Sequence, residues 1–199
     1  VIWVEDRLEH LTAASSASGR LTKLRASINE KGLIEALDYD QIDDVGAYPR
    51  APEPASLYRM HGNLSGAYKV KNIRCRNRVV LTNKTPSGLN RGFGGPQHYF
   101  ALERLVHQIA VELDLNVLDV IKVNLLEKKQ FPYKSPSGAL LDSGDFQKLV
   151  RKVVKSSTYK NILKKKNNAI KNGKIYGIGY SAIIEPSISN MGYVTTALP

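Results

Sequence analysis

The fold is decided by residues Arg91–Leu113, RGFGGPQHYFALERLVHQIAVEL, where a glycine-rich loop runs into an amphipathic helix pattern. Three glycines in four positions, Gly92, Gly94 and Gly95, let the backbone bend tightly and approach another molecule closely. Pro96 suits the first position of a helix, where its missing N–H costs nothing. The loop therefore ends at a helix N-terminus, where backbone donors and the macrodipole favour an anion. This chemistry is typical of a cofactor or substrate cradle.

Apolar residues after the loop recur with the spacing of one helical face. They are Leu102, Leu105, Val106, Ile109 and Leu113. Asn116 is placed to cap a second short helix through Leu126, and Ser143 to cap a third. A further basic helix is expected over about 158–172. The sequence therefore predicts helices over residues 97–172.

Strand patterns precede the loop. Residues 22–42 alternate in polarity around the turn-forming segment Asn29–Gly32 and predict a hairpin. Residues 73–81 predict another strand, with arginines on the face opposite Cys75; these are Arg74, Arg76 and Arg78. Including a strand at Val1–Val4, residues 1–82 are predicted to form hairpins, and residues 174–184 a closing strand. Without βαβ alternation, we expect an α+β fold with a mixed or antiparallel sheet and helices packed on it.

The composition of the 199 residues narrows the class of protein. Hydrophobic residues make up 42% of the chain, enough to bury a core. The single cysteine, Cys75, excludes an internal disulfide or a multi-cysteine metal site, and we expect it to be a small buried side chain. The four histidines match no metal-binding spacing and are assigned surface or packing roles. No apolar run of membrane-spanning length and no secretion signal are present, so we expect a cytoplasmic protein.

Positive charge is concentrated in residues 145–174. This segment holds ten Lys or Arg residues against one acid, Asp145, in a chain of net charge +11. A nucleic-acid-binding module built on this segment is therefore an alternative function. Its aromatic residues are only Phe146, on a predicted core face, and Tyr159, so no stacking platform is interleaved with the charges. We favour a solvated helical face that keeps the protein soluble.

Both ends of the chain lie close to strand-like apolar runs. The chain has no initiator Met and opens with Val1-Ile2-Trp3-Val4. We therefore expect residues 1–186 to be a partial domain of a longer polypeptide. Residues 187–199 are expected to be a truncated connection to its C-terminal part.

Residues 91–97 resemble the active-site loop of the molybdenum hydroxylases, which include xanthine dehydrogenases, aldehyde oxidoreductases and carbon monoxide dehydrogenase-like large subunits. The resemblance continues in order over residues 1 to about 186. The other matching segments are residues 3–10 (WVEDRLEH), 66–73 (GAYKVKNI), 101–104 (ALER), 120–125 (VIKVNL) and 140–146 (LLDSGDF). The resemblance implies a partial molybdopterin-binding domain of a larger subunit. Such subunits oxidise aldehydes, purines or N-heterocycles with oxygen derived from water.

The resemblance also implies roles for individual residues. The residues implied to bind the molybdenum cofactor are Arg91, Gly92, Phe93, Gly94 and Gly95. Phe93 lies where xanthine-oxidising relatives stack a ring on the substrate. Arg59, nine residues before Tyr68, matches a substrate-orienting arginine of those relatives, and an ordinary surface or capping arginine is an equal alternative.

Some features of the family are missing from this chain. Gly92 stands where aerobic carbon monoxide dehydrogenases have a copper-binding cysteine, so a copper–molybdenum site is not expected. The family's general-base glutamate is expected outside this chain, so no catalytic residue is assigned and the isolated chain is expected to be inactive. The resemblance implies iron–sulfur clusters and FAD on an iron–sulfur small subunit and a FAD medium subunit, or on equivalent domains. It also implies a higher-order dimer of the complex.

Overall fold

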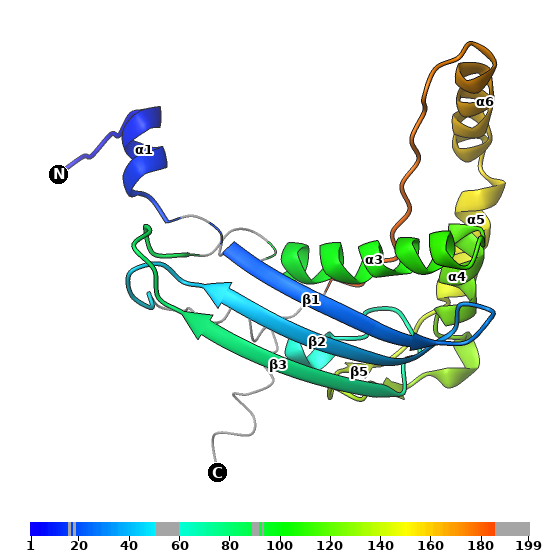
Figure 1. Ribbon diagram of the computed structural model, residues 1–199, viewed down its shortest axis with the longest axis horizontal. Helices are drawn as coiled ribbons and strands as arrows, with labels where there is room; N and C mark the ends of the chain where they lie inside the picture. The colour runs from blue at the N-terminus through cyan, green and yellow to red at the C-terminus, as the bar shows by residue number, and fades with distance from the viewer. Residues whose placement is uncertain (16, 18, 51–59, 89–91, 93, 186–199) are drawn as a thin grey trace.

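One three-stranded sheet, with helices on or beside it, organises the part of the chain that the structure describes (Figure 1). The computed structural model describes residues 1–15, 17, 19–50, 60–88, 92 and 94–185. β1 (Gly19–Ile28) and β2 (Ile34–Asp44) are antiparallel, and β3 (Asn72–Val80) lies parallel to β2. The fold is therefore α+β with a mixed sheet, which confirms the predicted class.

The β1–β2 hairpin is closed by local side-chain chemistry. The Asn29 Oδ1 atom accepts hydrogen bonds from the backbone N–H groups of Lys31 and Leu33, at 3.0 and 3.1 Å. Gly32 has a φ of +73°, a conformation in which glycine carries no steric penalty. The hairpin predicted over residues 22–42 is confirmed.

The pairing of β3 differs from the prediction that residues 1–82 consist of hairpins. β3 joins β2 in parallel and follows it only after residues 45–71. A parallel pair needs such a long crossover, which alternation within one strand does not reveal. The predicted faces of β3 are nevertheless correct: its arginines are exposed, whereas Cys75 is partly buried. Burial raises the pKa of the Cys75 thiol, which suits a packing role.

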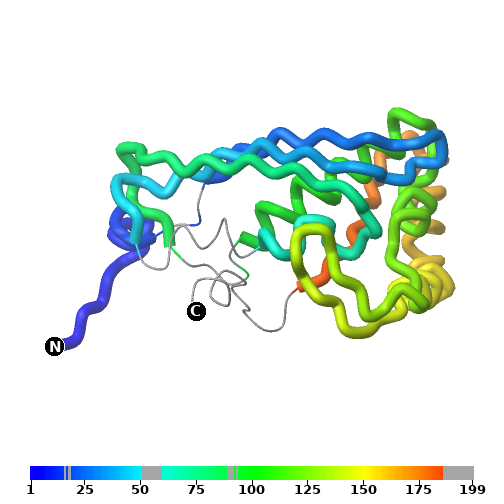
Figure 2. The backbone as a smooth tube through the Cα atoms, turned by 90° about the horizontal axis from the view of Figure 1, so that it is seen from below, coloured from blue at the N-terminus to red at the C-terminus, as the bar shows by residue number. Residues whose placement is uncertain are grey.

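The core lies between the inner face of the sheet and two helices, α3 (Gly95–Glu112) and α4 (Val117–Asn124). Its fully buried members include Leu37, Tyr39, Tyr68, Leu102, Val106, Val120 and Leu125. The Asn116 side chain accepts from the Leu118 N–H and caps α4 as predicted. In Figure 2 the strands run along one side of the molecule, and loops and helices lie on the other.

The remaining elements lie around this core. α1 (Arg7–Ala13) begins at the Asp6 capping box, and a short hairpin joins β4 (Tyr133–Lys134) to β5 (Leu140–Leu141). α5 (Phe146–Lys155) is followed directly by α6 (Ser157–Lys171). The short 3-10 helices are His61–Asn63 and Lys128–Gln130. No helix in the described part of the chain combines the length and apolar character of a membrane span.

Two local predictions are wrong. Val1–Val4 is exposed and forms no strand, because no other described segment pairs with it. α5 is capped by Asp145, whose side chain accepts from the Lys148 N–H, and not by Ser143. Val1–Val4 has no partner strand among the described residues, and the third helix begins two residues later than Ser143 predicts.

Residues 174–184 are the third departure, because this segment forms no strand in the structure. Side chains of α3 hold it instead. The Glu103 Oε2 atom accepts from the Ala182 N–H at 2.9 Å, and the His107 Nε2 atom lies 2.7 Å from the Tyr180 carbonyl oxygen. Glu103 also accepts from the Tyr68 hydroxyl at 2.9 Å. Side chains thus take the hydrogen bonds that a neighbouring strand would have made.

Burial of Glu103 predicts a pH-dependent stability. Burial raises the pKa of the Glu103 carboxyl in the folded chain above the ordinary value of 4.5, which applies to the unfolded chain. At a pH between the unfolded and the folded pKa, the folded chain keeps a proton that the unfolded chain releases. The free energy of unfolding therefore falls as pH rises through this interval. Glu103→Gln removes the titration, so its stability relative to wild type should increase from pH 4 to pH 8 in urea unfolding. Exposed Glu35→Gln is the control, and parallel profiles for E103Q and wild type would contradict the expectation.

Candidate functional site

The glycine-rich loop forms a tight backbone turn at the N-terminus of α3. Gly92 and Gly94 have φ angles of +80° and +79°, which L side chains rarely adopt. The Gly95 N–H donates to the Gly92 carbonyl oxygen at 2.8 Å, and Pro96 stands in the first turn of α3. That first turn holds no acidic residue. The helix end therefore favours an anionic or strongly polar ligand.

The structure describes only part of the predicted site. Gly92, Gly94 and Gly95 are brought together in the turn. Arg91, Phe93 and Arg59 lie outside the described residues, so their roles stay predictions.

Gln97 is a candidate site residue that the sequence reasoning did not assign. Its Oε1 atom is buried and accepts no hydrogen bond from the described residues. Buried polar atoms in folded proteins nearly always have a partner. The Gln97 amide is therefore suited to a bound group that donates a hydrogen bond. The only sequence signal for it is its place at the end of the loop, directly after Pro96.

His98 lies beside Gln97 and is packed in the interior, with 1% of its surface exposed. Its ring stacks on Tyr39 with 5.7 Å between centroids. Its pKa is lowered from 6.5 to about 3, mainly by burial and to a smaller extent by the nearby positive charge of Arg20 and by the His61 ring. Neither ring nitrogen makes a hydrogen bond of normal geometry with the described residues. His98 is therefore a neutral packing residue, one of the two roles predicted for the histidines.

A buried ion pair lies close to His98. The Arg20 Nε atom is 3.2 Å from Asp43 Oδ1, and Arg20 Nη2 is 3.3 Å from Asp43 Oδ2. The two side chains are 2% and 0% exposed. A groove of about 790 Å³ between β1 and α3 is lined by Arg20, Pro96 and Gln97, among others. A cation and an amide thus adjoin the same space next to the glycine turn.

These features fit an organic anionic cofactor better than a metal held by protein ligands. No group of three or more His, Cys, Asp or Glu side chains in the described part of the chain is arranged to hold a metal ion. The glycine turn, the α3 N-terminus and the buried Gln97 amide offer hydrogen-bond donors and acceptors instead. This set suits a large polar group that approaches the backbone closely.

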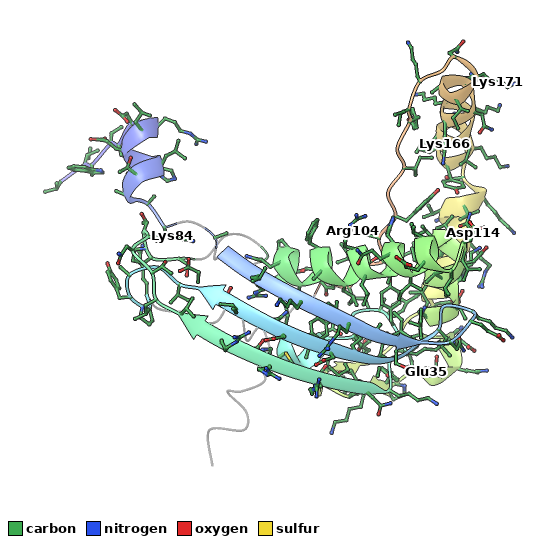
Figure 3. All side chains as sticks on the ribbon, in the orientation of Figure 1. Glu35, Lys84, Arg104, Asp114, Lys166 and Lys171 are labelled. Carbon is green, nitrogen blue, oxygen red and sulfur yellow. The ribbon has the colours of Figure 1, made fainter. Side chains whose placement is uncertain are left out.

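The basic segment 145–174 forms a different kind of surface. It makes up α5 and α6, which project away from the sheet, with Lys166 and Lys171 on α6 (Figure 3). Its two aromatic rings are engaged within the protein: Phe146 packs on Phe131 at 5.2 Å, and Tyr159 lies 6.3 Å from Tyr180. Neither ring is arranged as a platform for stacking bases.

Comparison with known families identifies the class of domain to which the chain belongs. Residues 1–125 match the model of the family described as the molybdopterin cofactor-binding domain. The chain belongs to this family. Membership agrees with the resemblance of residues 91–97 and with the donor set of the loop.

Individual relatives of this molybdopterin-binding chain are oxidoreductase subunits. The chain is 27% identical to the nicotine 6-hydroxylase large subunit of Paenarthrobacter nicotinovorans, over 96% of this chain and 24% of the relative. It is 28% identical to the carbon monoxide dehydrogenase large chain of Afipia carboxidovorans, over 93% of this chain and 24% of the relative. The chain therefore spans about a quarter of the length of these curated relatives.

A solved relative confirms the fold. The structure of quinoline 2-oxidoreductase from Pseudomonas putida 86 superposes with a TM-score of 0.76 at 25% identity, covering 86% of this chain and 22% of that chain. Gly92 has a φ of +80°, a conformation that suits glycine and would strain a cysteine. The absence of a copper site stays a prediction.

Proposed function

We propose that this chain forms one wall of the cofactor pocket in the large subunit of a molybdenum hydroxylase, an oxidoreductase acting on an aldehyde, a purine or another N-heterocycle. The observation that carries the proposal is the glycine turn at the N-terminus of α3, within a chain of the molybdopterin-binding family. The two curated relatives named above, a nicotine 6-hydroxylase large subunit and a carbon monoxide dehydrogenase large chain, support an oxidoreductase.

The chain's own residues would hold the cofactor by three means. The backbone of Gly92–Gly95 would line it, Arg91 would contact it, and the buried Gln97 amide would accept a hydrogen bond from it. When bound, the molybdenum group supplies oxygen transfer to a substrate carbon and accepts two electrons. Phe93 would present an aromatic face to a flat substrate, and Arg59 would orient it.

Other parts of the enzyme would complete this site. The general-base glutamate belongs to another segment of the subunit. The relatives are subunits of multi-subunit complexes. We propose an iron–sulfur small subunit and a FAD medium subunit as partners, in a dimeric complex in the cytoplasm. They would carry electrons away from the pocket.

Arg91→Ala in the complete enzyme tests the cofactor role. A charge-assisted hydrogen bond contributes about 1.5–3 kcal/mol, so we expect roughly ten- to hundredfold weaker retention of the cofactor. Molybdenum per enzyme, measured by mass spectrometry after dialysis, reports the loss. Arg151→Ala, which removes an arginine exposed by 58% on α5, is the control. Unchanged molybdenum and activity in R91A would refute the role of Arg91.

A further inference from the structure

The outer face of the β1–β2–β3 sheet is uncovered in the described part of the chain. The core and its helices occupy the inner face, as Figure 2 shows. The β2–β3 pair is parallel, and parallel strands in folded proteins ordinarily have both faces covered. On this outer face Leu21, 58% exposed, lies opposite Ile42 in the strand register. The described residues therefore leave one face of the sheet without a cover.

The charged side chains on this face are arranged by strand. Its basic side chains stand on the outer strands β1 and β3 and are Lys23, Arg25, Arg74, Arg76 and Arg78. Two carboxylates, Asp38 and Asp40, stand between them on β2. We call the four arginines the arginine ladder. Five cations against these two anions leave an excess of positive charge, and the third carboxylate of this face, Asp44 at the end of β2, is paired with Lys84.

The carboxylates orient the ladder without covering it. Arg74 is held in bidentate fashion, with its Nε and Nη2 atoms 2.8 and 2.7 Å from the two Asp38 oxygens. Arg78 Nη2 lies 2.7 Å from Asp40. The four arginines nevertheless remain 51% to 77% exposed. Each guanidinium has five N–H donors, so several donors on each exposed arginine still face solvent.

The choice of arginine separates this face from the other basic surface. Four of the five cations in these rows are arginines, whereas nine of the ten on residues 145–174 are lysines. Protein interfaces are enriched in arginine and depleted of lysine, because the planar guanidinium pairs with carboxylates at lower cost in entropy and hydration. The ladder has the composition of a recognition surface, and the lysine-rich helices that of a solvated one.

We propose that the arginine ladder docks an acidic face of a partner subunit in the enzyme complex. This inference rests on the proposed function, which supplies the multi-subunit complex. A protein is favoured over a nucleic acid because the Asp38 and Asp40 row divides the positive charge into two stripes. Two positive stripes with a negative row between them can be matched by a protein surface of complementary charges. The negative row would repel a continuous polyanion such as a nucleic acid.

The test uses the large subunit containing this chain, co-produced with its iron–sulfur and FAD subunits. The variant R74E/R76E/R78E is compared with K164E/K165E/K166E, which makes the same change in charge on α6. We expect about a hundredfold or greater loss of affinity between subunits for the arginine triple and less than about threefold for the lysine triple, since close charge pairs at interfaces couple strongly. Light scattering after size exclusion and titration of separated subunits measure this.

Additional variants and a molybdenum assay distinguish a failure of this inference from a failure of the proposed function. R74K/R76K/R78K keeps the charge, preserves folding where reversal disturbs it, and should still weaken assembly about tenfold through loss of the planar donors. Molybdenum content should be unchanged in every ladder variant, whereas R91A should lose molybdenum and still assemble. Assembly of the arginine triple with the affinity of wild type or of the lysine triple would overturn the inference. Binding of duplex DNA that the ladder variants abolish, with assembly unaffected, would reassign the face to nucleic acid.

Discussion

Asp43→Ala is expected to lower the free energy of unfolding by about 3–5 kcal/mol, the usual result of breaking a buried ion pair from one side. Asp43 and Arg20 face each other across β1 and β2, with side chains that are 0% and 2% exposed. Removing the carboxylate takes the Asp43 charge away from a buried guanidinium. Equilibrium urea unfolding at neutral pH measures the loss.

Asp38→Ala is the matched control for this prediction. Asp38 lies on the same strand and also pairs with two arginines, Arg25 and Arg74, but these are 77% and 68% exposed. Exposed ion pairs contribute little to stability because solvent screens them, so the loss should be small. The double variant R20M/D43L should recover most of the stability, because two apolar side chains can replace a buried pair. A loss for D43A no larger than that for D38A would show that burial of the pair is unimportant.

Asn124→Ala is expected to cost about 3 kcal/mol or more, since unsatisfied buried groups cost about 1–3 kcal/mol each. Asn124 ends α4 and is 1% exposed. Its Oδ1 atom accepts from the Ile34 N–H at 2.8 Å, and its Nδ2 atom donates to the carbonyl oxygens of Gly32 and Val120, each at 2.8 Å. The side chain thus joins the start of β2 to α4.

Asn116→Ala controls for the loss of an asparagine from the same helix. The Asn116 side chain accepts one hydrogen bond within the described residues, from the Leu118 N–H at an exposed N-cap, and such caps contribute about 1 kcal/mol. Urea midpoints of both variants give the comparison. Equal destabilisation by N116A and N124A would mean that the link from α4 to β2 adds nothing to stability.

The elements that could be predicted from sequence are those with local causes. The β1–β2 hairpin follows from alternation and from the Asn29 turn, and α3 follows from the spacing of Leu102, Val106 and Ile109. The glycine turn was predictable because glycine accepts a positive φ without steric penalty, and Gly92 and Gly94 both adopt one. Family resemblance added the cofactor, which no periodicity can supply.

Non-local pairing accounts for what could not be predicted. The parallel β2–β3 pair depends on a crossover, and residues 174–184 form no strand because Glu103 and His107 bind their backbone. Gln97 appears as a site candidate only once its amide oxygen is seen buried without a described partner. Each of these facts depends on which distant atoms meet.

The sequence by itself determined the glycine turn ahead of an amphipathic helix, the α+β class and the resemblance to the molybdopterin-binding family, since backbone permissiveness and helical spacing are properties of neighbouring residues. Only the tertiary structure decided that Arg20 and Asp43 are buried together, and that four exposed arginines share the open face of the sheet. The alternation of β1 separates Arg20 from Arg25, but what covers each face depends on distant segments. Because Arg20 is buried, it is part of the core, whereas the four exposed arginines can contact a partner protein.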